Sequence, residues 1–214
     1  VSDTAKVCFI YNDSISTQID TTLTANNDTA TTAHDTPVTI DILANDVVFD
    51  QLVALIDSIE VNVSSTIPIC IIPYDERLDR IKKEINSRAN LSLFDNQKSI
   101  ECWDNFAKKV WNSHSRNNLG RIARPRWYKS NLQRKFASFD GAFDRFVFYD
   151  ADSLAMKPLD GIFAKLNEYD FVFDDWEHRK PDSIAALNIS IIEESGLYSK
   201  EQIIPKLHCG SFFA

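Results

Sequence analysis

Two aspartates, Asp150 and Asp152, follow the apolar run RFVFY and are separated by one alanine. Carboxylates at positions i and i+2 of an extended backbone point to the same side, so both can reach one hard cation. Such a cation, Mg²⁺ or Mn²⁺, keeps positions open for phosphate oxygens and neutralises a diphosphate leaving group. Because the chain has 22 aspartates, chance alone supplies about two Asp-x-Asp triplets. The surroundings of the pair therefore decide its meaning.

A basic stretch precedes the pair. Residues 105–139 contain no Asp or Glu and carry nine positive charges, on Lys108, Lys109, Arg116, Arg121, Arg124, Arg126, Lys129, Arg134 and Lys135. Such a stretch is ordinarily a solvated basic face. Its position just before the acidic pair favours a surface that binds a metal-bound diphosphate. Within it, Arg124 and Arg126 are candidates for a bidentate phosphate clamp.

A second acidic group follows the apolar run FVF. It consists of Asp174 and Asp175, with Trp176 directly after them. Carboxylates bind hydroxyl-rich groups well, and an indole ring offers a flat apolar surface on which a sugar can stack. These three residues are therefore expected to face a sugar.

Short apolar runs alternate with helical patterns along most of the chain. The runs predict strands at 6–11, 68–73, 145–150, 170–174 and 207–213, and the patterns predict helices at 47–61, 75–89, 100–111, 127–138 and 200–206. Apolar strands between helices predict an α/β fold with a mainly parallel, covered sheet. In such sheets ligands bind beyond the carboxyl ends of the strands, where Asn12, Asp75, Asp150 and Asp174 fall.

Residues 14–46 differ in composition from the rest of the chain. They hold nine of the eleven threonines, five aspartates, and no Lys, Arg or aromatic residue. The segment lies between Asn12-Asp13 and Asn45-Asp46, and without it the text reads VCFIYNDVVFDQLVALIDSI, an apolar strand that runs into an amphipathic helix. We therefore expect an inserted segment that protrudes from a strand-to-helix turn as a flexible loop.

The second half of this segment, ANNDTATTAHDTPVTIDILANDV, resembles the opening strands of cadherin-like and immunoglobulin-like repeats of large bacterial adhesins. Only about a quarter of one such domain is present, and these domains need several strands to bury one core. The segment is therefore not expected to fold as a module.

Composition restricts the partners and the compartment. A net charge of −8 argues against nucleic acid as the main partner. No run approaches the 18 or more apolar residues of a membrane span, so no transmembrane segment is expected. The four cysteines form no CxxC pair, and two lie in apolar runs, as reduced core thiols do. These features predict a reducing, cytoplasmic compartment.

The segment WYKSNLQRKFASFDGAFDRFVFYDADSLAMKPLDGIF resembles the central part of GT-A fold glycosyltransferases, most closely the glycogenin and galactosyltransferase-like group. In that family a helix with a basic residue precedes a strand ending in D-x-D, and a Pro-Leu turn with a short helix follows. Lys129, Asp150 and Asp152, and the Lys-Pro-Leu turn match these features. Apart from residues 14–46, the resemblance runs from Lys6 to the end. It implies a Rossmann-like GT-A domain that lacks its C-terminal half.

The resemblance also implies a function. The chain would be a metal-dependent glycosyltransferase that moves a sugar from a nucleotide-diphosphate-sugar, most plausibly a UDP-sugar, to a saccharide or other acceptor. Asp150 and Asp152 would hold Mn²⁺ or Mg²⁺. The residues implied to border the nucleotide and diphosphate are Tyr11, Asn12, Asp75, Arg126, Lys129, Tyr149 and Ala151. Those implied to border the sugar or acceptor are Asp174, Asp175, Trp176, Gly210 and Ser211.

Three other interpretations stay open. In a haloacid dehalogenase-type phosphatase Asp150 would be the nucleophile and Asp152 the acid/base, but Leu154 stands where that family has Thr or Val. A non-catalytic surface or adhesion fragment would bind calcium through residues 14–46, but no D-x-[DN]-x-[DN]-G loop is present. In the third interpretation the two aspartates only cap a buried strand of an α/β domain.

Overall fold

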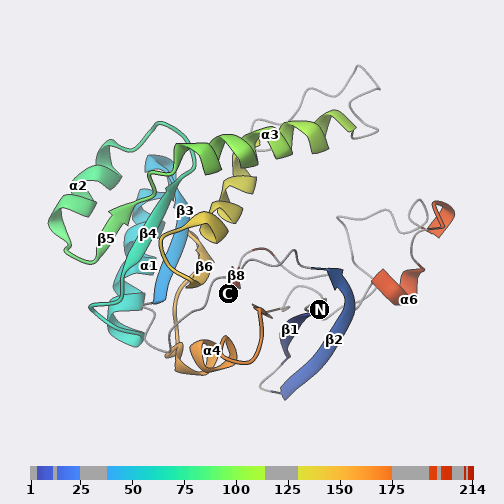
Figure 1. Cartoon of the computed structure of the whole chain (residues 1–214). Coiled ribbons are helices and arrows are strands. Elements are labelled where there is room, and N and C mark those ends of the chain that lie inside the picture. Colours follow the sequence, from blue (N-terminus) through green and yellow to red (C-terminus); the bar gives the residue numbers. More distant parts are fainter. Residues whose placement is uncertain are drawn as a thin grey trace. The chain divides into compact units, whose positions relative to one another are not determined.

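The computed structural model describes residues 4–11, 14–24, 38–113, 130–174, 193–196, 199–203, 210 and 212–214. The chain divides into two compact units, one formed by residues 31–161 and the other by residues 1–30 together with 162–214. Strands and helices occur in both units (Figure 1), which confirms the predicted α/β class.

A parallel sheet forms the centre of the unit 31–161. Its strands are β3 (Val38–Ala44), β4 (Ile69–Pro73), β5 (Leu91–Leu93) and β6 (Arg145–Asp150), in the order β6-β3-β4-β5. All three pairings are parallel. Because parallel strands point the same way, the carboxyl ends of β3, β4 and β6 meet at one edge.

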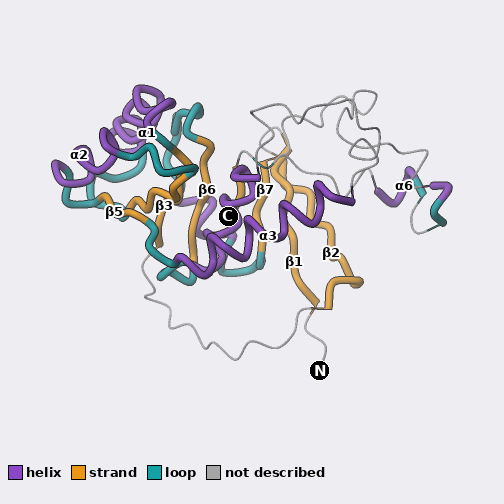
Figure 2. The backbone as a smooth tube through the Cα atoms, turned by 90° about the horizontal axis from the view of Figure 1, so that it is seen from above, coloured by secondary structure: helices purple, strands orange, loops and turns teal. Residues whose placement is uncertain are grey.

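Helices cover both faces of this sheet (Figure 2). The helix α1 (Phe49–Asn62) packs on one face, and α3 (Gln97–Ser113) with the 3-10 helix η4 (Ser130–Asp140) lies on the other. The elements η1 (Asp46–Val48) and α2 (Asp79–Ser87) belong to the same unit, and α4 (Asp160–Lys165) spans the boundary between the two units. Side chains spaced at helical intervals on α1 are fully buried, namely Leu52, Leu55, Ile56 and Ile59. Burial of this apolar stripe against β-branched strand residues stabilises the unit.

The other unit contains a mixed set of strands. There β1 (Thr4–Tyr11) pairs antiparallel with β2 (Ser14–Thr24) and parallel with β7 (Phe171–Asp174), and β7 pairs antiparallel with β8 (Phe212–Phe213). A short helix, α6 (Lys200–Ile203), lies in the same unit. The prediction of a mainly parallel sheet is therefore wrong for the chain as a whole, and holds only for residues 31–161.

The expectation that residues 14–46 form a flexible loop is wrong for the part that the structure describes. Residues 14–24 form β2, and residues 38–44 form β3, which lies between β4 and β6. Six of the seven β3 residues are buried. The strand predicted to run into α1 was 6–11; in the structure 38–44 holds that place, because VTIDILA also offers an almost continuous apolar run.

Within the part of the chain that the structure describes, none of the helices has the length and apolar character needed to cross a membrane.

Candidate functional site

A cavity of about 910 Å³ opens at the carboxyl ends of β3, β4 and β6, wholly within the unit 31–161. It is lined by Leu43, Ala44, Asn45, Val47, Val48, Gln51, Tyr74, Asp75, Glu76, Arg77, Asn131, Leu132, Asp150, Ala151 and Asp152. Pockets of this size and position bind small ligands in open α/β sheets. The cavity is therefore the candidate site.

The two aspartates of the D-x-D triplet lie on its wall. Asp150 is the last residue of β6, and its carbonyl accepts a hydrogen bond from the N–H of Ser153 (3.0 Å), which closes a tight turn through Asp152. The loop beyond the turn is fastened to α1: the N–H of Ala155 donates to Oγ of Ser58 (2.9 Å), and Nδ2 of Asn62 donates to the Ala155 carbonyl (2.9 Å). These bonds fix the backbone that carries both carboxylates.

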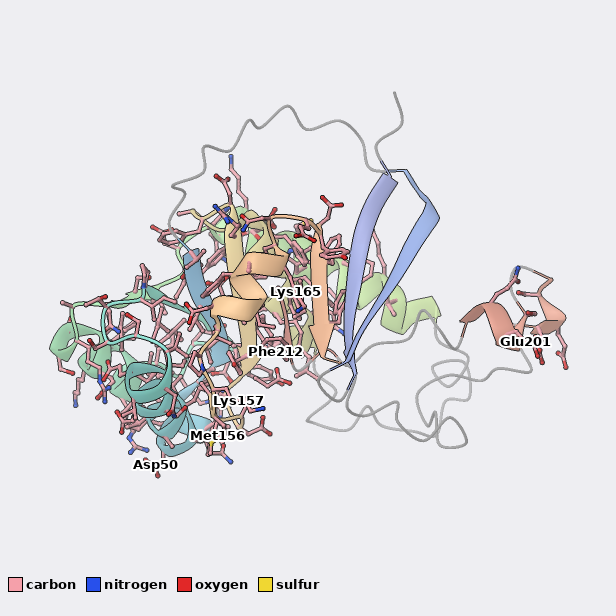
Figure 3. The ribbon with its side chains drawn as sticks, turned by 90° about the horizontal axis from the view of Figure 1, so that it is seen from below. Asp50, Met156, Lys157, Lys165, Glu201 and Phe212 are labelled. Carbon is pink, nitrogen blue, oxygen red and sulfur yellow. The ribbon has the colours of Figure 1, made fainter. Side chains whose placement is uncertain are left out.

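The next residues of this loop face away from the core. Met156 is 72% exposed, and Lys157 beside it is also exposed. Figure 3 shows both side chains directed outward from the loop that follows β6. Leu159, in contrast, is buried and anchors the turn. In the Lys-Pro-Leu turn, the leucine is therefore the residue that packs into the core.

The carboxylate of Asp150 is paired with a lysine. Nζ of Lys135, on η4, lies 3.1 Å from Oδ1 and 3.5 Å from Oδ2 of Asp150. The same ammonium lies 5.2 Å from the centre of the Phe148 ring, and 13% of the lysine side chain is exposed. Asp152 is exposed and makes no hydrogen bond or ion pair with the other described residues. The carboxylate of Asp150 is thus paired with the ammonium of Lys135, whereas the carboxylate of Asp152 faces solvent.

Asp75 lies across the cavity, just beyond β4. Its carboxylate accepts hydrogen bonds from Nδ2 of Asn45 (2.9 Å) and from Nε of Arg77 (3.0 Å). Partial burial acts to raise the pKa of Asp75, but the bonds from Arg77 and Asn45 outweigh it and hold that pKa below 3.8. Asp75 is therefore ionised at neutral pH.

Two side chains of η4 hold the end of β4 in place. Nδ2 of Asn131 donates to the Tyr74 carbonyl (2.7 Å), and Nη1 of Arg134 donates to the carbonyls of Pro73 (3.0 Å) and Tyr74 (3.2 Å). The remaining guanidinium nitrogens of Arg134 bind both oxygens of Asp104 on α3, at 2.9 and 2.8 Å. This bidentate pair with Asp104 raises the pKa of Arg134 further. Arg134 thus fixes the backbone that leads to Asp75.

The predicted site residues fall into four groups. The cavity brings together Asp75, Asp150, Ala151 and Asp152. Tyr149 is buried in β6 and does not line the cavity. Tyr11, Asp174 and Gly210 belong to the other unit, and Asn12, Arg126, Lys129, Asp175, Trp176 and Ser211 lie outside the described residues.

The predicted nucleoside contact at Tyr11 assumed that the strand 6–11 leads into the first long helix. Tyr11 ends β1, which pairs with β2 and β7, whereas the strand that leads into η1 and α1 is β3. The positions beyond that strand are Ala44 and Asn45, and both line the cavity.

Sequence reasoning missed several residues of the site: Asn45, Arg77, Asn131 and, as the partner of Asp150, Lys135. Two of these residues, Asn45 and Lys135, belong to patterns that the sequence shows. Asn45-Asp46 repeats Asn12-Asp13 after an apolar run, and Lys135 belongs to the basic stretch. Arg77 and Asn131 carry no pattern that distinguishes them from other polar loop residues.

The acidic residues fit a divalent cation only in part. No group of three or more His, Cys, Asp or Glu side chains that could hold a metal occurs in the described ranges. Asp150 and Asp152 supply two carboxylates on one turn, and Mg²⁺ is commonly held by one or two carboxylates together with phosphate oxygens and water. The set therefore suits a cation that arrives with a phosphate ligand rather than a permanent metal.

No protein-family model, no curated protein and no solved structure matches the chain.

Proposed function

We propose that this chain is a metal-dependent, GT-A-like glycosyltransferase domain that transfers a sugar from a nucleotide-diphosphate-sugar to an acceptor. The observation that carries the proposal is the position of Asp150 and Asp152 with Asp75 on the wall of one 910 Å³ cavity at the carboxyl ends of the strands. The cavity is large enough for a nucleotide-sized ligand.

The charges around the cavity support a metal requirement. Among the described residues that line it are four acids, Asp75, Glu76, Asp150 and Asp152, and one base, Arg77. A free diphosphate would be repelled by this wall, whereas a diphosphate that shares a cation with Asp150 and Asp152 would not. When bound there, Mn²⁺ or Mg²⁺ would stabilise the charge of the departing diphosphate.

The chain's own residues have separate tasks in this proposal. Asn45 and Asp75 present an amide and a carboxylate on one side of the cavity, and these groups suit the hydroxyl and N–H groups of a nucleoside. Lys135, next to Asp150, adds a positive charge where the diphosphate would lie. Arg134 and Asn131 hold the β4 backbone, so Asp75 is already in position before a ligand arrives.

A thermal-shift screen of nucleotide-sugars, each with and without Mn²⁺, tests this function. The proposal predicts a rise in melting temperature for at least one nucleotide-sugar, only when Mn²⁺ is present. A chromogenic phosphate hydrolysed with Mg²⁺, in the absence of any such shift, would favour the phosphatase instead. Absence of both responses would favour a domain in which Asp150 and Asp152 only end a strand.

A further inference from the structure

The dipeptide Asn45-Asp46 joins β3 to the helices that follow it. Oδ1 of Asn45 accepts the N–H of Val47 (3.0 Å) and caps η1. The carboxylate of Asp46 accepts the N–H groups of Arg80 (3.0 Å) and Ile81 (3.1 Å) in the first turn of α2. The place of β3 in the sheet therefore suits an apolar strand followed by Asn-Asp. Both side chains accept hydrogen bonds from N–H groups at helix N-termini that would otherwise be unpaired.

The chain contains a second segment of this kind. Residues 6–13 read KVCFIYND, and residues 39–46 read TIDILAND. When the two Asn-Asp pairs are superposed, residues 6–11 correspond one to one with 39–44. Cys8 then corresponds to Asp41, Phe9 to Ile42 and Tyr11 to Ala44.

Residues 39–44, which belong to the strand between β4 and β6, include a residue that suits the centre of a sheet poorly. Asp41 is 2% exposed and lies in register between Cys70 of β4 and Phe148 of β6. Among the described residues it has no ion-pair partner, and its hydrogen bond from Oγ1 of Thr39 is long, at 3.4 Å. Oγ of Ser138 also faces Asp41 and acts to lower its pKa, but the two groups do not reach the geometry of a full hydrogen bond. A buried carboxyl group with such weak partners is unfavourable. The other segment would place the small, apolar Cys8 there.

The other segment has costs of its own. Phe9 at the position of Ile42, which is fully buried, would overpack the core. Tyr11 at the position of Ala44 would meet less resistance, because Ala44 lines the cavity. Pairing of β1 with β2 and β7 would also be lost. Lys6 would take the position of Thr39, which is 3% exposed, and would bring a positive charge to a buried part of the strand. Each segment therefore carries residues that suit the central position poorly.

We propose that residues 6–11 can replace residues 39–44 as the strand between β4 and β6, so the chain has two alternative strands for one position. In the exchanged state Asn12 would take over from Asn45 the contact with Asp75, and the side chain of Tyr11 would enter the cavity. The exchange therefore changes the candidate site. It does not depend on any particular ligand or reaction.

Asp41→Arg in the full chain tests the exchange. Arginine cannot lose its charge, so residues 39–44 can no longer occupy the buried position. The proposal predicts that this variant still unfolds cooperatively, with residues 6–11 as the central strand. The double variant Cys8→Arg, Asp41→Arg blocks both segments and is predicted not to fold. Both variants are compared by circular dichroism during thermal unfolding.

Hydrogen exchange followed by mass spectrometry identifies the strand in place. In Asp41→Arg, amides of 39–44 should lose protection, on the order of 100-fold, and those of β2 should lose it as well because β1 leaves them, while amides of 6–11 stay protected. The proposal is overturned if Asp41→Arg is as unfolded as the double variant, if the double variant folds as well as the single one, or if 39–44 stay protected in Asp41→Arg.

A variant without residues 14–46 provides an independent measurement. It retains 6–13 directly before Val47 and lacks 39–46 altogether. Cooperative unfolding near the melting temperature of the full chain is the expected result, and a chain without a thermal transition would contradict the exchange.

Discussion

The ion pair between Lys135 and Asp150 joins the basic stretch to the acidic pair at the level of single residues. The ammonium lies 3.1 Å from the carboxylate, and each side chain is mostly shielded from solvent. Lys135 therefore reduces the negative charge that Asp150 presents to a cation. In the proposed enzyme the lysine must turn from this carboxylate toward the diphosphate when the metal binds.

Lys135→Met should raise the affinity for Mn²⁺ in the absence of nucleotide. Removal of the competing ammonium is worth about 1 kcal/mol at a partly screened site, or roughly a fivefold lower Kd. Isothermal titration of Mn²⁺ into the two proteins measures the change. Lys98→Met, on α3, is the control, since Lys98 does not line the cavity. Equal or weaker Mn²⁺ binding by Lys135→Met would show that Asp150 is not a metal ligand.

Arg134 joins α3 to the end of β4. Only 12% of its side chain is exposed, and it binds Asp104 and two β4 carbonyls. Arg134→Met leaves these groups without their donor and should lower the free energy of unfolding by about 3 kcal/mol. Urea denaturation measures this loss.

A surface ion pair serves as the comparison for Arg134. Arg80 and Asp50 are 52% and 86% exposed and lie 2.7 Å apart. Asp50→Ala should therefore change the free energy of unfolding by less than about 1 kcal/mol. Similar losses in Arg134→Met and Asp50→Ala would mean that Arg134 does not fix the end of β4.

The strand β3 carries a titratable side chain, Asp41, in the buried centre of the sheet. Burial raises the pKa of Asp41 to about 7, although the hydroxyls of Ser138 and Thr39 act to lower it. The unfolded chain releases this proton near pH 3.8, and the folded chain retains it until about pH 7. Between these values the unfolded state binds fewer protons, so stability falls as pH rises.

Asp41→Asn should remove this pH dependence. The loss in wild type between pH 4 and pH 7 amounts to about 4 kcal/mol, since one pKa unit corresponds to about 1.4 kcal/mol. The two proteins should have similar stability at pH 4, and the variant should be more stable at pH 8. Urea denaturation at both pH values measures the difference. Parallel stability curves would show that Asp41 does not keep its proton in the fold.

The elements also show what the sequence could predict. Strands 145–150 and 68–73 and the helix after Asp46 were predicted within a few residues, because their apolar periodicity is strong and local. The place of β3 was not predicted. Two segments that end in Asn-Asp compete for it, and the choice depends on packing against β4 and β6, which no local pattern contains.

In the candidate site too, some residues follow from local sequence patterns and others depend on contacts between distant segments. Asp75, Asp150 and Asp152 could be predicted because each follows an apolar strand, and parallel strands bring their ends together. Asn131 and Arg134 could not be assigned in the same way. Their role depends on η4 packing against the end of β4, a contact between segments about 60 residues apart.

For the whole molecule, the net charge of the chain and the balance of charged side chains on the described cavity wall are both negative. A net charge of −8, and four acids against one base among the described residues of the cavity wall, disfavour any anion that arrives alone. A nucleotide diphosphate can bind there if a divalent cation arrives with it. Nucleotide binding to this cavity should therefore depend on the metal.

Calorimetric titration of UDP, the part common to UDP-sugar donors, tests that claim most directly. The expected result is heat of binding with Mn²⁺ and none without it, and loss of that binding in Asp150→Ala and in Asp152→Ala. Asp144→Ala is the control, because Asp144 is exposed just before the amino end of β6 and does not line the cavity. Mn²⁺-dependent binding that is unchanged in both Asp150→Ala and Asp152→Ala, or equal binding with and without Mn²⁺, would contradict a metal-dependent nucleotide-sugar site.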